Sequence, residues 1–147
     1  VDTIDFRLAK AAELGAAYLV NGTGEEAVGK LKSLFGEIGP EWVFECCGKA
    51  NREALNAVCS GGQVVFVGEN FSKEIHTSDD LIRKCLRVMG TWYLARSDVE
   101  LNLQLIKTSA CDPARLVTHK LPFEEIAQGF ELFCEHPDEC LKVVLLF

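Results

Sequence analysis

The sequence has 147 residues, of which 48% are hydrophobic and 25% charged, and its 15 Lys and Arg against 22 Asp and Glu give a net charge of −7. This composition excludes a disordered, collagen-like or low-complexity chain, and the length suffices to bury a sizeable core. An acidic chain without a basic cluster is a poor candidate for binding nucleic acid or an anionic membrane surface. Apolar runs such as Val64–Val67 and Val143–Phe147 are strand-sized and far shorter than the roughly 20 residues of a membrane span.

The seven cysteines form no metal-binding pattern. Only Cys46 and Cys47 lie close together in sequence, no Cys-x-x-Cys pair occurs, and the three histidines are scattered. We therefore expect reduced cysteines that pack in strands and on helix faces, and a chain that binds no zinc of its own. No Ser-His-Asp grouping, Cys-His pair or paired-carboxylate pattern can be assembled, so we assign no catalytic residue. The sequence shows no signal-peptide or transit pattern, which favours a cytoplasmic protein.

Helical and extended patterns alternate over residues 4–68. Apolar residues at helical spacing, each set followed by glycine, predict helices. These helical patterns cover residues 4–14, 27–35 and 54–58. Short apolar runs between them predict strands. The predicted strands are Ala17–Val20, Trp42–Cys47 and Gln63–Val67.

The pattern is looser in the second half of the chain. Ser97 and Asp98 can cap a helix that carries Val99, Leu103 and Ile106 on one face and extends to Ser109. The other predicted helices are Asp79–Leu86 and Phe123–Phe133. The predicted extended segments are Glu74–His76, Arg87–Tyr93, Leu116–His119 and Leu141–Phe147.

Strands that alternate with helices favour an α/β fold, with a mostly parallel sheet, right-handed crossovers and flanking helices. In such sheets, ligands bind at the carboxyl ends of the strands. The one plausible boundary is Asp112-Pro113, where the strand–helix alternation gives way to a short C-terminal unit. We therefore expect two parts, residues 1–112 and 113–147.

The segment Gly22–Ala27 matches the dinucleotide fingerprint Gly-x-Gly-x-x-Ala, and Glu45 follows about 20 residues later. Its glycines would let backbone N–H groups approach a pyrophosphate at a helix N-terminus. However, Glu25 and Glu26 place two carboxylates in the first helical turn, where acidic residues ordinarily compensate the helix dipole. A stand-alone nucleotide-binding module and an ordinary turn both remain open.

Two further sets of residues are candidates for binding a nucleotide. Asp2 can accept hydrogen bonds from the hydroxyls of a ribose, and Arg7 can lie over the same sugar; alternatively, Asp2 only caps a helix and Arg7 is solvated. Glycines also follow predicted strands at Cys47-Gly48, Val67-Gly68 and Gly90–Tyr93. Each of these glycines could serve a turn alone, but together at one edge of a sheet they indicate a groove.

A series of residue groups recurs in a familiar order along the whole chain. The groups are Val1-Asp2, Arg7, Ala11–Ala16, Val20-Asn21, Val43–Gly48, Gly61–Gly68, Met89–Tyr93, Leu116–Glu125, Gly129-Phe130 and Leu141–Val144. In this order and spacing the chain resembles the C-terminal part of medium-chain, zinc-dependent alcohol dehydrogenases of the polyol or threonine dehydrogenase type.

The resemblance implies an NAD site. Asp2 corresponds to the acidic residue on the adenosine ribose and Arg7 to its basic neighbour. The other implied contacts are Cys47 and Gly48 beside the second ribose and the adenine side, Val67 and Gly68 along the nicotinamide, and the backbone of Thr91 and Tyr93 at the carboxamide. Gly22–Ala27 then corresponds to an ordinary turn after the family's third strand.

The resemblance also implies what the chain lacks. In the family, the first strand, the Gly-rich loop and the zinc ligands precede the position of Asp2. Residues 1–112 would be an incomplete Rossmann-type dinucleotide-binding domain without that strand and loop, and residues 113–147 would return to the catalytic domain. Ala17–Val20 would have lost both of its usual neighbouring strands.

The expected parent is an NAD- and zinc-dependent dehydrogenase that acts on a small alcohol or polyol. We expect the 147-residue chain alone to be zinc-free and inactive, and to form a homo-oligomer through the edge strand at 87–93. A non-catalytic fragment that only oligomerises is the third hypothesis, beside the stand-alone nucleotide-binding module.

Overall fold

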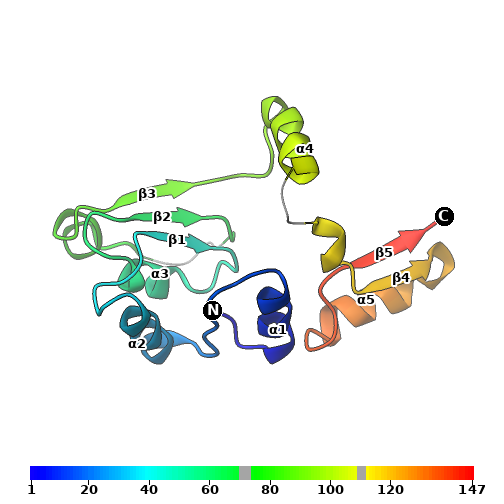
Figure 1. Ribbon diagram of the computed structural model, residues 1–147, viewed down its shortest axis with the longest axis horizontal. Coiled ribbons are helices and arrows are strands. Elements are labelled where there is room, and N and C mark those ends of the chain that lie inside the picture. The colour runs from blue at the N-terminus through cyan, green and yellow to red at the C-terminus, as the bar shows by residue number, and fades with distance from the viewer. Residues whose placement is uncertain (70–73, 109–111) are drawn as a thin grey trace. The chain divides into compact units, whose positions relative to one another are not determined.

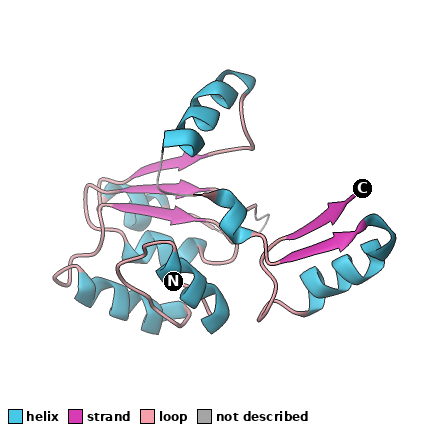
Figure 2. Cartoon of the chain, turned by 45° about the vertical axis from the view of Figure 1, so that its right-hand side comes forward, coloured by secondary structure: helices cyan, strands magenta, loops and turns pink. Residues whose placement is uncertain are grey.

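The computed structural model describes residues 1–69, 74–108 and 112–147. These residues form two compact units. The first consists of Val1 and Val20–Tyr93, and the second of Asp2–Leu19 and Leu94–Phe147. Each unit contains a parallel sheet with helices beside it, as the arrows and coils of Figures 1 and 2 show.

The sheet of the first unit has three parallel strands in the order β1-β2-β3. The strands are β1 (Trp42–Glu45), β2 (Gln63–Phe66) and β3 (Arg87–Gly90). Each connection between neighbouring strands contains a helix: α3 (Asn51–Ala57) between β1 and β2, and a π-helix over Thr77–Ile82 between β2 and β3. Helical and extended patterns alternate in the sequence because parallel neighbouring strands require a long connection that returns along one face of the sheet.

Apolar residues of α3 and β2 form the core of the first unit. The fully buried cluster consists of Ala54, Leu55, Val58 and Val64. Half-buried side chains that pack on it are Val43, Phe66, Leu81, Leu86 and Val88. The helix α2 (Gly24–Leu34) lies against α3 and buries Ala27.

The second unit contains α1 (Asp5–Glu13), α4 (Val99–Thr108), α5 (Ile126–Glu135) and the strands β4 (His119–Pro122) and β5 (Val143–Leu146). Three short 3₁₀ turns lie between them, at Arg96–Asp98, Pro113–Leu116 and Phe123–Glu125. The helix α5 packs on β4 and β5. A Cβ atom on Gly129 of α5 would lie 3.3 Å from Cγ1 of Val143, so the glycine permits this close packing.

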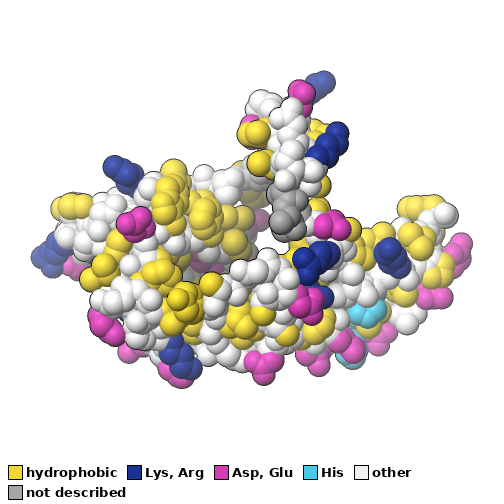
Figure 3. Space-filling view, in the orientation of Figure 1, with side chains coloured by type: hydrophobic (Ala, Val, Ile, Leu, Met, Phe, Trp, Pro, Cys, Tyr) yellow, Lys and Arg dark blue, Asp and Glu magenta, His cyan; other side chains and the backbone are white. Residues whose placement is uncertain are grey.

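Side-chain hydrogen bonds connect distant segments within the second unit. The hydroxyl of Thr118 accepts from the backbone N–H of Leu141 at 3.1 Å, next to the β4–β5 pairing. The guanidinium of Arg115 donates to the carbonyl of Glu13 at the end of α1, at 2.8 Å. By contrast, α4 buries none of its residues, and hydrophobic side chains remain at its surface (Figure 3).

The α/β fold with parallel sheets and flanking helices, predicted from the sequence, is confirmed. Some predicted elements differ. Residues 17–20, all of them described, form no strand, and Tyr18 and Leu19 are exposed. Apolar composition alone makes no strand where no neighbouring strand is present to share its hydrogen bonds.

Two further segments of the first unit differ from the prediction. Residues 74–76 are not a strand, and the predicted helix Asp79–Leu86 is the shorter π-helix Thr77–Ile82. Ser109, the expected end of α4, and Cys111 lie outside the described residues. No helix of the described residues is long and apolar enough to span a membrane. The division into parts at Asp112 stays a prediction.

Candidate functional site

The carboxyl ends of β1, β2 and β3 lie at one edge of the sheet in the first unit. Glu45, Phe66 and Gly90 are opposite one another in register. The segments that follow these strand ends therefore emerge at the same edge, as the parallel topology predicts. The N–H of Thr91 donates to the carbonyl of Phe66 at 3.1 Å and continues the pairing of β3 with β2 beyond the assigned strand.

The turns after β1 and β2 are packed against one another through two glycines. A Cβ atom on Gly68 would lie 2.0 Å from the backbone nitrogen of Gly48, and one on Gly48 would lie 2.2 Å from the carbonyl oxygen of Glu69. Gly48 also has a φ of +71°, in the left-handed region. The structure thus brings together Cys47-Gly48 and Val67-Gly68, two of the strand ends predicted to form a groove.

The carboxylate of Glu45 organises the turn after β1. Oε1 accepts hydrogen bonds from the backbone N–H groups of Cys47 and Ala50, both at 3.2 Å, and lies 2.9 Å from the donating thiol of Cys47. Oε2 accepts from the N–H of Gly48 at 3.0 Å. The side chain is only 3% exposed, so this carboxylate is one of the few buried charged groups of the described residues.

Glu45 remains ionised despite its burial. Burial raises the pKa of its carboxyl, but the hydrogen bonds from Cys47, Ala50 and Gly48 outweigh that effect and hold the pKa below the ordinary value. The hypothesis of a stand-alone nucleotide-binding module uses Glu45 together with Gly22–Ala27. In the structure, the carboxylate oxygens of Glu45 accept hydrogen bonds from donors of the chain itself. Its acidic character at a strand end is readable in the sequence, whereas the amides that surround it depend on the shape of the turn.

The segments after β3 are open to solvent. Tyr93 is 86% exposed, has a φ of +49°, and packs edge-on against Trp92 with ring centroids 4.4 Å apart. Thr91 is also exposed. The N–H of Thr91, one of the backbone groups that the resemblance assigns to a carboxamide, is already bonded to Phe66.

The segment Gly22–Ala27 leads into α2, as the fingerprint requires. Ala27 is buried and would touch a Cβ atom on Gly22 at 3.7 Å. Glu25 and Glu26 stand in the first turn of α2, and Glu26 pairs with Lys30 at 2.6 Å. The structure thus retains the two exposed carboxylates where a phosphate would have to bind.

Asp2 and Arg7 belong to the second unit, before and within α1. Oδ1 of Asp2 accepts from the backbone N–H groups of Thr3 at 2.8 Å and of Ile4 at 3.0 Å. Nε of Arg7 is buried and has no hydrogen-bond partner among the described residues. An unsatisfied buried donor costs free energy, so Arg7 has capacity for a further acceptor.

The described residues contain no group of three or more His, Cys, Asp or Glu that could hold a metal ion. Burial, together with the charge of Glu45, raises the pKa of the Cys46 thiol, so this thiol stays protonated at neutral pH. Cys47 donates its thiol hydrogen to Glu45. Because zinc sites need several thiolate, imidazole or carboxylate ligands, these residues do not fit a zinc ion.

An apolar groove of about 210 Å³ lies on the second unit, between α5 and β5. Its lining residues are Ile126, Gly129, Phe130, Phe133, Lys142, Val143 and Leu145. None of the residues predicted to bind a cofactor lines it.

The sequence of this chain is similar to those of known dehydrogenases. Residues 1–108 match a protein family described as zinc-binding dehydrogenase. L-threonine 3-dehydrogenase of Symbiobacterium thermophilum is 30% identical over 144 residues, which cover 90% of this chain and 39% of that protein. This chain spans about two fifths of the length of the curated relatives that it matches.

Solved structures show the same fold. Alcohol dehydrogenase TADH from Thermus sp. ATN1 is 33% identical with a TM-score of 0.85, covering 99% of this chain and 42% of that one. The short chain alcohol dehydrogenase rspB from E. coli CFT073, complexed with NADH, is 24% identical with a TM-score of 0.85. That match covers 99% of this chain and 43% of the other, and it concerns the fold alone.

Proposed function

The chain belongs to the zinc-binding dehydrogenase family, and we propose that it supplies part of the NAD site of an enzyme that oxidises an alcohol or polyol. The similarity to an L-threonine 3-dehydrogenase and to an alcohol dehydrogenase supports a hydroxyl-bearing small molecule as the substrate of the whole enzyme. Bound NAD would supply the hydride acceptor for this oxidation.

The observation that carries this proposal is the edge formed by the ends of β1, β2 and β3. There, two turns pack backbone against backbone at Gly48 and Gly68, which fixes the positions of the two strand ends relative to one another. Val67 and Gly68 would line the nicotinamide, and the backbone of Thr91 and Tyr93 would hold its carboxamide. Cys47 and Gly48 would lie beside a ribose and the adenine side.

Asp2 and Arg7 would recognise the adenosine ribose. The carboxylate of Asp2 can accept hydrogen bonds from two ribose hydroxyls, and its charge would repel a 2′-phosphate. The side chain of Arg7 would lie over the same sugar. The residues therefore fit the nucleotide, whereas the described part of the chain does not fit zinc, and its proposed contribution is confined to binding and orientation.

We also propose that the protein assembles as a homo-oligomer through the β3 edge. Among the described residues, the strand β3 pairs only with β2, and Met89 on it is 42% exposed. Open strand edges with apolar side chains favour association with another chain.

A thermal-shift series with NAD, AMP and no ligand, combined with light scattering, tests the proposed function. Ligand that binds only the native state raises the melting temperature. We expect NAD and AMP to raise it, and Gly68→Ala to abolish the shift, since the added methyl group would displace the turn. A melting temperature that neither nucleotide changes at millimolar concentration would contradict the proposal.

A further inference from the structure

The carboxylate of Glu45 connects the end of β1 to every part of the following turn. Its two oxygens accept from three backbone amides and one thiol between Cys47 and Ala50. Ala50 is the last residue before α3 and has no side-chain group that could cap the helix. One buried side chain therefore ties a strand end, a turn and the start of a helix together.

We propose that Glu45 is a positioning residue for the nucleotide, which holds the turn 46–50 in the shape that allows Gly48 and Gly68 to pack together. This inference rests on the proposed function, since it assumes that the edge beside these glycines binds NAD. Glu45 itself does not touch the ligand. It acts through the backbone of the turn.

The geometry explains why a carboxylate is needed at this position. All of the atoms that face it are donors, and an ionised carboxylate offers acceptors alone. A glutamine side chain would turn two N–H donors toward the N–H of Gly48 or toward that of Ala50. Hydrogen bonds to an ionised acceptor are also stronger than neutral ones, which suits a turn with a left-handed residue.

The consequence of loosening the turn falls on the ligand-binding edge. The nitrogen of Gly48 and the carbonyl of Glu69 leave no room for a methyl group between the two turns. Any outward shift of residues 47 and 48 therefore changes the contact with Gly68. Nucleotide affinity should follow this shift even where the sheet and its core stay intact.

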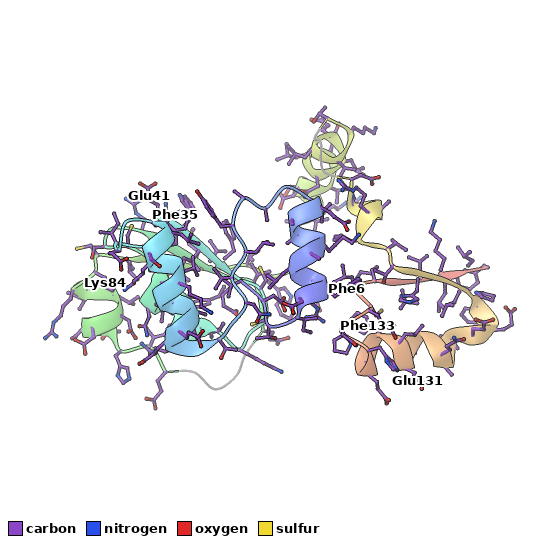
Figure 4. The ribbon with its side chains drawn as sticks, turned by 60° about the horizontal axis from the view of Figure 1, so that its bottom comes forward. Phe6, Phe35, Glu41, Lys84, Glu131 and Phe133 are labelled. Atoms are coloured by element: carbon purple, nitrogen blue, oxygen red, sulfur yellow. The ribbon has the colours of Figure 1, made fainter. Side chains whose placement is uncertain are left out.

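The variants Glu45→Gln and Glu41→Gln in the 147-residue chain form a matched pair. Glu41 precedes β1, at the opposite end of the strand, and its side chain is exposed and points outward in Figure 4. Both changes remove one negative charge from the same unit. We expect Glu45→Gln to accelerate hydrogen exchange of the Cys47, Gly48 and Ala50 amides and to weaken NAD binding in calorimetry by about tenfold. Glu41→Gln should leave the amide exchange rates and the NAD affinity unchanged.

Substitutions of Cys47 test the same contact without altering the carboxylate. Cys47→Ala removes only the thiol donor and should accelerate hydrogen exchange of the Gly48 and Ala50 amides. Cys47→Ser retains an O–H donor and should keep the exchange of these amides slow. Since Cys47 is exposed, both variants should fold, and they test the role of Glu45 if Glu45→Gln does not fold. A general packing role would lower the melting temperature of the alanine and serine variants alike and leave their amide exchange rates equal.

The outcomes separate this inference from the proposed function. If the unmutated chain does not bind NAD, the proposed function is contradicted, and the exchange rates alone decide whether Glu45 holds the turn. If the unmutated chain binds NAD and Glu45→Gln binds it equally well, the positioning role is overturned. Unchanged amide exchange in Glu45→Gln would overturn it as well.

Discussion

Residue 68 has to be a glycine because it packs tightly against the neighbouring turn. A methyl group at this position would lie 2.0 Å from the nitrogen of Gly48, whereas one on Gly90, at the end of β3, meets no atom within 4 Å. We expect Gly68→Ala to lower the free energy of unfolding by about 1–3 kcal/mol, because the two backbones must separate. Urea unfolding measures this value, and Gly90→Ala, the same change in open space, is the control. Equal stability of the two variants would contradict the close approach.

Asp80 forms a partly buried ion pair whose effect should depend on pH. The side chain, 6% exposed, pairs with the guanidinium of Arg52 and accepts from the N–H of His76 at 2.7 Å. Burial raises the pKa of Asp80, but the His76 hydrogen bond and the Arg52 charge outweigh it and hold the pKa below the ordinary 3.8. A lowered pKa means stability that is present above about 3.8 and lost as the pH falls through the folded-state value.

We therefore expect Asp80→Asn to destabilise the protein by about 1–3 kcal/mol at pH 7, and less as the pH approaches 3. Asp79→Asn is the matched control, since Asp79 is exposed on the same π-helix and pairs at 2.6 Å with Arg83, the residue that follows that helix. An exposed pair of this kind contributes below about 0.5 kcal/mol. A pH-independent difference between Asp80→Asn and the unmutated chain would show that the charge of Asp80 plays no part.

The sequence predicts some features of the site and not others. Glycines after apolar strands were recognisable at Gly48 and Gly68, because backbone approach needs a missing side chain. The sequence also marks Glu45 as an acid at a strand end. Its contacts were not predictable, because hydrogen bonds to the amides of Cys47 and Ala50 depend on a turn without periodicity.

At the scale of elements, the strand β3 forms one edge of its sheet. The N–H groups of Arg87 and Thr91 donate to the carbonyls of Gly62 and Phe66 in the adjacent chain segment. Gly90 is one residue out of phase with them, so its N–H points to the open edge. A partner strand would use this donor.

We expect the unmutated chain to sediment as a dimer or larger species, and Gly90→Pro to shift it toward the monomer. Proline removes the outward N–H and leaves the pairing of β3 with β2 intact, since a side chain at Gly90 meets open space. Gly90→Ala retains the N–H and should remain associated. A monomer of the unmutated chain at micromolar concentration would contradict assembly through this edge.

Strand pairing explains which of the predicted strands form in the structure. The strands 42–47 and 63–67 were predicted nearly within their bounds, because both combine apolar runs with following glycines. Residues 17–20 have the same apolar character but form no strand in the structure, and periodicity does not report whether a neighbouring strand exists. The π-helix at Thr77–Ile82 could not be distinguished from an α-helix, since both place Leu81 toward the core.

At the scale of the whole molecule, metal content is a direct test of how the chain relates to its family. The described residues offer no cluster of zinc ligands, although the family is described as zinc-binding. We expect less than stoichiometric zinc in the purified chain after dialysis against a chelator, measured by inductively coupled plasma mass spectrometry. Stoichiometric zinc that survives repeated purification would require a site that involves residues outside the described ranges.

We propose that this chain binds NAD and that Asp2 recognises the adenosine ribose. Calorimetric titration of the chain with NAD and NADP, for the unmutated protein and Asp2→Asn, tests it most directly. Asparagine retains an oxygen that can accept from the N–H groups of Thr3 and Ile4 but loses the negative charge. We expect the unmutated chain to bind NAD more tightly than NADP, and Asp2→Asn to reduce this difference in affinity. Equal or tighter binding of NADP by the unmutated chain would contradict it.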